Sequence, residues 1–274
     1  MLDINKLREE FTGPHYLLKT VDKKMLFLRQ YKPISESNIA ILILHGITGY
    51  SGPYTEVMGE PLAKAGFDVF GLDLRGHGLS DGNRGDCPSR KLLLSDIEKV
   101  ISFLKEKYLK LIIMGHSLGV VTAGIALQQH QKQIDGLVLL SAARETRPGV
   151  YKKTPFGKKM KILFSGIFKP SKQVIEYYRE GMSGLDDPLF NFKYTPRFLI
   201  ALNPKKLMFP DLEIPVLLGL GDEDELFTVD AAKELFEEIN SPNKEFIVFK
   251  GAKHAEFPED TGDQLVAWIK KNFN

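Results

Sequence analysis

Cysteine is nearly absent from this sequence, because Cys87 is the only one among 274 residues. A single cysteine excludes an internal disulfide and any metal site built from several cysteines. The first residues carry no apolar segment of the kind that opens a secretory signal, and no apolar run is long enough to span a membrane. Net charge is small, at +2, and gives no general attraction to nucleic acid. We therefore expect a cytoplasmic protein, at most peripheral at a membrane, with no nucleic-acid partner.

Short apolar runs alternate with amphipathic segments along most of the chain. The apolar runs span 39–44, 68–72, 111–114, 137–140, 216–220 and 245–249. The amphipathic segments span 54–65, 89–107, 118–130, 229–239 and 262–272, and a hairpin is expected before them over residues 15–31. This alternation predicts an α/β protein with a doubly wound, mostly parallel sheet, whose reactive residues collect at the carboxyl ends of the strands.

One interval, residues 142–215, breaks the alternation because it contains no strong strand run. Its length is too great for an ordinary loop and predicts an inserted cap. Residues 147–172 within it include eight basic side chains and no acidic one, interleaved with aromatic and aliphatic residues. The basic residues are Arg147, Lys152, Lys153, Lys158, Lys159, Lys161, Lys169 and Lys172. The pattern fits either a solvated helix face or contact with an anionic lipid surface.

A Gly-x-Ser-x-Gly pattern is centred on Ser117. It follows the apolar run 111–114 and precedes a helical pattern, so the chain must turn sharply at the serine. The flanking glycines leave room for such a turn, which lifts the serine hydroxyl clear of the backbone. We therefore predict that Ser117 is a nucleophile rather than an ordinary turn serine.

A serine hydroxyl needs a base within hydrogen-bond reach, and that base needs a carboxylate to orient it. His254 follows directly after the run 245–249, at the carboxyl end of the last expected strand, and is our candidate base. The acid should follow the run 216–220, where four carboxylates stand in consecutive positions. We choose Asp224 from these four, with Asp222 as the second choice.

Acyl transfer also requires donors for the oxyanion of the tetrahedral intermediate. The backbone amide of Leu118, at the start of the helix after the serine, is one candidate. The second should come from the glycine-containing loop 45–49, which follows the run 39–44. We expect the Ile47 amide to fill this role, because Gly46 and Gly49 permit close approach of the backbone.

Several motifs acquire a common explanation when they are read together. They are the chain order Ser117, Asp224, His254, the upstream His45-Gly46, the stretch Asp73-Leu74-Arg75-Gly76-His77-Gly78-Leu79-Ser80-Asp81-Gly82, and Asp187-Pro188-Leu189. As a set they resemble the α/β-hydrolase superfamily, and more narrowly its monoacylglycerol lipase and lysophospholipase branch, sometimes grouped with serine aminopeptidases. The resemblance covers nearly the whole chain, residues 39–268.

The resemblance implies an eight-stranded α/β-hydrolase sheet with a helical cap or lid. The core would comprise residues 1–143 and 211–274, and the cap residues 144–210. It supports Asp224 as the acid and the Ile47 and Leu118 amides as the oxyanion hole. It also makes Asp73, Arg75 and His77 parts of a structural turn. We expect substrate contacts from five further residues: His45, Gly46, His116, Phe164 and Phe168.

The implied chemistry is cleavage of carboxylic esters of single-chain lipids through an acyl-enzyme on Ser117. No metal and no organic cofactor is expected, and the partner is a small ester or lipid, with transient membrane contact through the basic cap. The same triad would also serve a short-chain carboxylesterase, a thioesterase, an aminopeptidase or an acyltransferase. A ligand-binding protein without turnover is a further alternative, against which the intact set of reactive residues argues.

Overall fold

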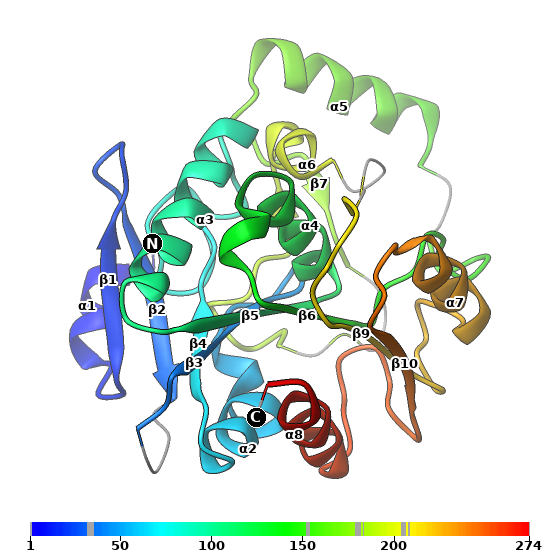
Figure 1. Ribbon diagram of the computed structural model, residues 1–274. Helices are drawn as coiled ribbons and strands as arrows, with labels where there is room; N and C mark the ends of the chain where they lie inside the picture. Colours follow the sequence, from blue (N-terminus) through cyan, green and yellow to red (C-terminus); the bar gives the residue numbers. More distant parts are fainter. Residues whose placement is uncertain are drawn as a thin grey trace.

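A computed structural model describes residues 2–31, 36–151, 154–178, 182, 184–203, 207 and 209–273. Eight strands form one sheet in the order β1-β2-β4-β3-β5-β6-β9-β10 (Figure 1). Their bounds are β1 His15–Lys19, β2 Met25–Tyr31, β3 Ile39–Leu44, β4 Asp68–Leu72, β5 Lys110–His116, β6 Gly136–Leu140, β9 Val216–Gly221 and β10 Lys244–Phe249. Only the pairings β1–β2 and β2–β4 are antiparallel within this sheet. The predicted hairpin and mostly parallel eight-stranded sheet are therefore confirmed.

Helices cover both faces of the sheet, which explains the nearly continuous apolar strands. One face carries α3 (Arg90–Lys105), α4 (Leu118–His130) and α7 (Val229–Glu238), and the other α2 (Glu60–Lys64) and α8 (Asp260–Phe273). In β3, Leu42 and Leu44 pack with the first group, whereas Ile41 and Ile43 pack with the second. Side chains alternate between the faces of a strand, so an all-apolar strand fills two cores at once.

The amphipathic segment 54–65 does not form the single α-helix that the sequence predicts. It begins with a 3₁₀ turn, Gly52–Tyr54, continues as a π-helical turn, Thr55–Gly59, and only then becomes α2. Pro61 explains the irregularity, because it has no N–H to donate to the carbonyl four residues earlier. The Glu60 amide bonds to the Thr55 carbonyl, five residues back. This loosened turn places Tyr54 beside the carboxyl ends of the strands.

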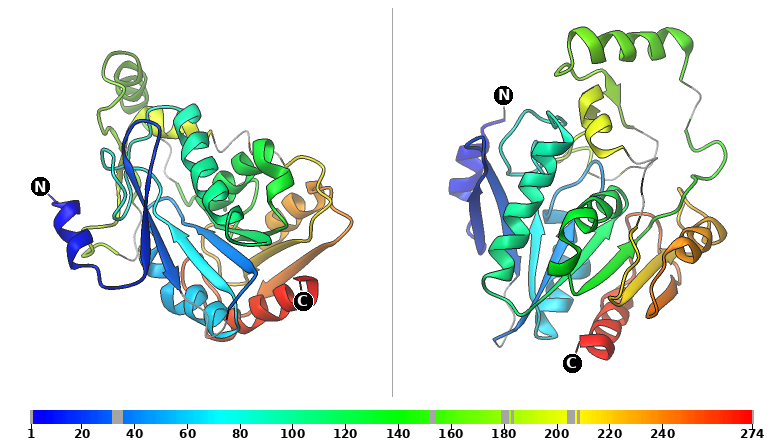
Figure 2. Two further views of the ribbon diagram at one scale, coloured as in Figure 1. Left: turned by 60° about the vertical axis from the view of Figure 1, so that its left-hand side comes forward. Right: turned by 45° about the horizontal axis from the view of Figure 1, so that its top comes forward.

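The interval between β6 and β9 contains the elements α5 (Phe156–Phe168), β7 (Ile175–Glu176), β8 (Lys193–Tyr194) and α6 (Pro196–Leu202). Strands β7 and β8 form a small antiparallel ribbon that the sequence does not predict. Helix α6 packs into the main core through Phe198 and Leu202. Helix α5 instead stands away from the sheet and has no buried residue (Figure 2). Two of the predicted basic residues, Lys152 and Lys153, lie outside the described residues.

The remaining helical elements are short: α1 (Ile4–Glu10) at the amino-terminal end and a 3₁₀ turn (Gln131–Gln133) after α4. None of the helices in the described part of the chain is long and apolar enough to cross a membrane.

Candidate active site

Ser117 occupies a strained turn between β5 and α4. Its backbone has φ 53° and ψ −113°, a combination that is costly for a residue with a side chain. Gly115 and Gly119 make the turn possible: a Cβ on Gly115 would lie 2.5 Å from the Gly119 carbonyl oxygen, and one on Gly119 would lie 1.9 Å from the Leu44 carbonyl oxygen. The turn has the geometry of the nucleophile elbow that the Gly-x-Ser-x-Gly pattern predicts.

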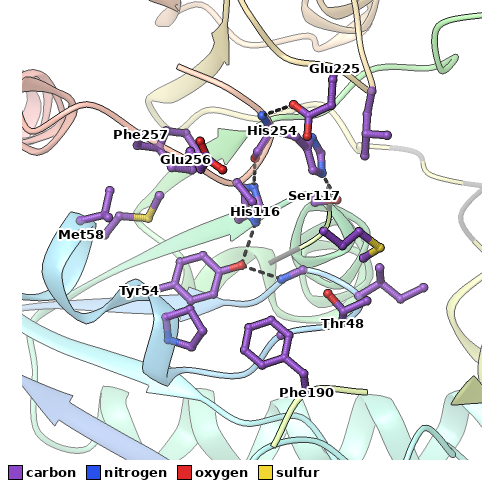
Figure 3. A pocket seen from close by; sticks show the side chains of 18 of the residues that line it. Thr48, Tyr54, Met58, His116, Ser117, Phe190, Glu225, His254, Glu256 and Phe257 are labelled. Atoms are coloured by element: carbon purple, nitrogen blue, oxygen red, sulfur yellow. Dashed lines mark hydrogen bonds between the residues drawn. The ribbon is translucent and has the colours of Figure 1, made fainter. Parts of the chain in front are cut away.

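The structure brings Ser117, His254 and Asp224 into one chain of hydrogen bonds (Figure 3 shows the first pair). The Nε2 atom of His254 lies 3.0 Å from the Ser117 hydroxyl oxygen. Its Nδ1 atom lies 3.0 Å from Oδ2 of Asp224. A carboxylate can only accept, so Nδ1 carries the proton and Nε2 is available to accept the serine proton.

The surroundings of Asp224 favour its charged form. Burial raises the pKa of this fully buried carboxyl, but contact with His254 and the Phe227 and Leu226 amides outweighs burial and lowers its pKa. Those two amides donate to Oδ1 at 2.9 and 2.8 Å. Asp222 points elsewhere and accepts the Gly251 amide at 2.6 Å. Of the two acids considered, the structure brings Asp224 to the base; its catalytic role stays a prediction.

The loop 45–49 lies opposite the elbow, and Gly46 and Ile47 line the same pocket as Ser117. The ring of His45 is buried beneath this loop: its Nε2 accepts the Leu74 amide at 3.1 Å. Its Nδ1 therefore carries the proton and donates to the Gly46 carbonyl at 2.8 Å. This bond fixes the peptide that links Gly46 to Ile47, whose N–H is the predicted oxyanion donor. The second donor, the Leu118 amide, begins α4 directly after Ser117.

The pocket above Ser117 is mostly apolar. Its walls include Tyr54, Met58, Tyr177, Phe190 and Phe257. No sequence pattern marks these residues as pocket walls, because Tyr54 and Met58 fall in the amphipathic segment 54–65 and the others come from the interval after α5 and the loop before α8. Such a wall suits an aliphatic chain, since it offers area rather than directed hydrogen bonds.

The five predicted substrate contacts divide into three groups. Gly46 and His116 line the pocket. His45 is buried beneath the loop and acts on its backbone, as described above. Phe164 and Phe168 do not line the pocket: they are 54% and 73% exposed on α5. Helix α5 turns both side chains to the outside, and their contact with substrate stays a prediction.

The stretch 73–82 does not line the pocket; its side chains bind the neighbouring loops and hold them in place. Asp73 accepts the Ser51 amide at 2.6 Å and the Leu79 amide at 2.7 Å. Arg75 forms ion pairs with Asp96 and Asp22 at 2.8 and 2.7 Å. These contacts agree with the structural turn that the resemblance implies. Among the described residues, no group of three or more His, Cys, Asp or Glu side chains is placed to hold a metal ion.

The sheet order, the elbow and the site at the carboxyl ends of the strands are those of an α/β-hydrolase. The sequence model of the family described as serine aminopeptidase, S33, matches residues 35–261, and the chain belongs to this family. The resemblance read from the motifs is thereby confirmed.

Individual relatives agree with this assignment. A monoglyceride lipase of Homo sapiens is 25% identical over 282 residues, which cover 94% of this chain and 90% of the human protein. The crystal structure of a monoacylglycerol lipase from Paleococcus ferrophilus has a TM-score of 0.69 and 25% identity, covering 90% of this chain and 97% of its own. A soluble variant of monoglyceride lipase from Saccharomyces cerevisiae, in complex with a substrate analog, has a TM-score of 0.76 at 19% identity. It covers 96% of this chain and 95% of its own, and this likeness shows the fold.

Proposed function

We propose that this protein is a serine hydrolase that cleaves carboxylic esters of single-chain lipids, with monoacylglycerols as the leading substrate class. The observation that carries the proposal is the relay from Ser117 through His254 to Asp224, with 3.0 Å at each step, at the floor of an apolar pocket. The lipase names of the relatives support the choice of a lipid ester over other acyl compounds.

In the proposed reaction, the Ser117 oxygen attacks the ester carbonyl while its proton passes to Nε2 of His254. Asp224 holds Nδ1–H and stabilises the imidazolium. The carbonyl oxygen becomes an oxyanion, which the amides of Ile47 and Leu118 would receive. Collapse of the intermediate expels the alcohol, which takes the proton from His254 and leaves an acyl-serine. Water, deprotonated by His254, then attacks this ester, and the fatty acid leaves as Ser117 regains its proton.

A fluorophosphonate probe tests the nucleophile directly, because it forms a covalent bond only with an activated serine. We expect the wild type to label and Ser117→Ala to remain unlabelled. Ser141→Ala is a matched control: Ser141 also has a positive φ, 51°, and is fully buried at the end of the neighbouring strand β6. Labelling that survives in Ser117→Ala, or a folded wild type that does not label, would contradict the proposal.

Substrate class is tested by turnover of monoacylglycerols, lysophospholipids and p-nitrophenyl esters of graded chain length, below and above micelle formation. An apolar pocket predicts that kcat/KM rises with acyl length, by up to about fourfold per buried methylene. A preference for acetyl esters that falls with each added methylene would indicate a short-chain carboxylesterase instead.

We also propose that residues 144–210 form a cap whose helix α5 rests on lipid surfaces. Phe156, Leu163, Phe164, Ile167 and Phe168 form an apolar stripe on α5, each at least half exposed. Their spacing of three, four or seven residues places them on one side of the helix. Lys158, Lys159 and Lys161 accompany the stripe, and residues 147–172 contain no acidic side chain. A helix of this kind suits a membrane interface, where each lysine gains about 1 kcal/mol near anionic headgroups.

Vesicle co-sedimentation tests this contact with matched charge reversals. We expect wild type to bind vesicles containing phosphatidylserine more strongly than neutral phosphatidylcholine vesicles. Lys159→Glu/Lys161→Glu should remove that preference, whereas Lys91→Glu/Lys99→Glu, the same change on exposed positions of α3, should keep it. Equal binding of wild type to both vesicle types would show that the lysines do not contribute to binding of a lipid surface.

A further inference from the structure

A second chain of hydrogen bonds runs behind the candidate triad and joins the loop that contains Gly46 to the loop that contains His254. The Tyr54 hydroxyl oxygen lies 2.9 Å from the Gly46 amide nitrogen and 2.7 Å from Nδ1 of His116. On the other side of the imidazole, Nε2 of His116 lies 2.7 Å from the backbone carbonyl oxygen of His254 (Figure 3). Tyr54 and His116 are both buried, so water does not compete for these bonds.

The positions of the protons in this chain of hydrogen bonds follow from the group at its end, the His254 carbonyl. The His254 carbonyl can only accept, so Nε2 of His116 carries a proton. Burial, followed by the neighbouring His254, lowers the pKa of His116 to about 3, which leaves the ring neutral at ordinary pH. Its Nδ1 is therefore an acceptor and receives the Tyr54 O–H, while the Tyr54 oxygen accepts the Gly46 N–H. Every donor in the chain has one acceptor, and the direction is fixed throughout.

The two ends of this chain of hydrogen bonds lie at the candidate oxyanion-binding loop and the candidate catalytic base, and the proposed reaction requires a fixed distance between these two groups. At one end, Gly46 precedes Ile47, the candidate oxyanion donor, and its carbonyl is already held by His45. At the other end, the carbonyl belongs to the candidate base, whose own amide donates to Glu225 at 2.9 Å. Held at both its backbone groups, His254 has a defined position although it lies in a loop. Catalytic geometry is sensitive to such placement, because displacement by about 1 Å can cost a hundredfold in rate.

We propose that Tyr54 and His116 are positioning residues that set the distance between the oxyanion-binding loop and the catalytic base. They touch neither the reacting atoms nor the proton that moves. The inference rests on the proposed ester hydrolysis and assigns a role to a tyrosine hydroxyl outside the triad. It also explains why a histidine stands immediately before Ser117. The His116 side chain points away from the serine hydroxyl and instead contacts Tyr54 and the His254 carbonyl.

Tyr54→Phe tests the proposal, because it keeps the ring and removes only the hydroxyl. We expect kcat for a monoacylglycerol to fall about tenfold to a hundredfold while KM changes less than about twofold. Affinity for a long-chain trifluoromethyl ketone, which forms a tetrahedral adduct with an oxyanion, should fall by a similar factor. Affinity for the matched methyl ketone, which reports only ground-state binding, should stay within about twofold.

Tyr31→Phe is a matched control. Tyr31 is as buried as Tyr54, at 8% exposure, and its hydroxyl donates to the Ser51 carbonyl at 3.0 Å outside the pocket. We expect both variants to lower the unfolding midpoint, but only Tyr54→Phe to lower kcat and trifluoromethyl ketone affinity. Equal kinetic losses in the two variants, or equal losses of affinity for the two ketones, would overturn the positioning role.

A second variant, His116→Asn, breaks the chain at the base, because asparagine can still accept from Tyr54 but cannot reach the His254 carbonyl. Its loss in kcat and that of Tyr54→Phe should not multiply in the double variant, since one break interrupts the whole connection. Fully multiplicative losses would contradict a single chain. A wild type that neither turns over esters nor labels with fluorophosphonate would instead remove the proposed function, and this inference with it.

Discussion

The imidazole Nε2 of His254 lies 3.0 Å from the hydroxyl of Ser117, although 137 positions separate the two residues. The parallel sheet explains this proximity. Ser117 follows β5 and His254 follows β10, and both strands end at the same edge of the sheet. Asp224 follows β9, the neighbour of β10, and completes the arrangement. Three strands thus bring the three candidate catalytic groups to one place without a long loop.

The distinction between Asp224 and Asp222 yields the first prediction. Asp224→Asn should lower kcat by about 10⁴-fold, because an amide that donates toward Nδ1 forces the wrong tautomer on His254. Asp222→Asn should leave kcat little changed, since asparagine can still accept the Gly251 amide that Asp222 binds. Steady-state kinetics on one ester, with circular dichroism to confirm folding, is the measurement. A larger loss in Asp222→Asn would reverse the assignment of the acid.

Residues fixed by strand ends could be predicted from the sequence. Ser117, Asp224 and His254 each follow an apolar run, and the topology of a parallel sheet converts that position into a meeting point. The sheet and the sharp turn at Ser117 could also be predicted, because the apolar runs indicate buried strands and the glycine pattern indicates the turn. Asp224 was separable from its neighbours only in part, since four adjacent carboxylates carry no periodic signal.

Residues placed by irregular backbone could not be predicted. Tyr54 fitted an amphipathic helix, whereas the structure shows a widened turn before Pro61 and the Tyr54 hydroxyl in contact with His116. Phe164 and Phe168 were expected to contact substrate because the insert would cover Ser117 and its apolar residues would suit an acyl chain. A sequence period shows that a helix has an apolar side, but it does not show whether that side meets the protein or a membrane.

Crowding at the elbow gives the second prediction. In Gly119→Ala, the new Cβ would lie 1.9 Å from the Leu44 carbonyl oxygen, so either α4 or β3 must move. We expect a loss of about 1–3 kcal/mol in the free energy of unfolding, even though alanine is the better helix former. Gly157→Ala is the control, because that helical glycine has open space around its Cβ position. Urea denaturation should show Gly157→Ala unchanged or slightly stabilised; equal effects would contradict the crowding argument.

Buried neutral histidines give the third prediction, on stability at acid pH. The pKa of His116 is lowered by burial to about 3 in the folded protein, from an ordinary value of 6.5. Between these values the unfolded chain binds the proton and the folded one does not, so stability is present in full above pH 6.5 and is lost as pH falls toward 3. His45 and His77 have lowered pKa values for the same first cause and act in the same direction.

The size of this effect can be measured on a variant. At pH 5 the contribution of His116 amounts to roughly 2 kcal/mol, since each unit below the ordinary pKa costs about 1.4 kcal/mol. His116→Asn removes the titrating group, so its free energy of unfolding should fall less between pH 7 and pH 5 than that of wild type. Urea titrations at the two pH values give the comparison. Identical pH dependence in both proteins would contradict the prediction, because it would show that the pKa of His116 is the same in the folded and unfolded states.

The outward orientation of α5 gives the last prediction, which separates binding of a lipid surface from binding of substrate. Phe164→Ser/Phe168→Ser should leave kcat/KM for a monomeric, water-soluble ester unchanged, because neither side chain lines the pocket above Ser117. The same variant should hydrolyse monoacylglycerol in vesicles more slowly, by about tenfold or more, since two large exposed rings no longer enter the interface. A matched change at Val21 and Leu109, exposed apolar residues elsewhere on the surface, should affect neither assay. If the soluble ester is turned over as poorly as the vesicle substrate, then α5 must reach the pocket in a conformation other than this one, and the two phenylalanines would be substrate contacts after all.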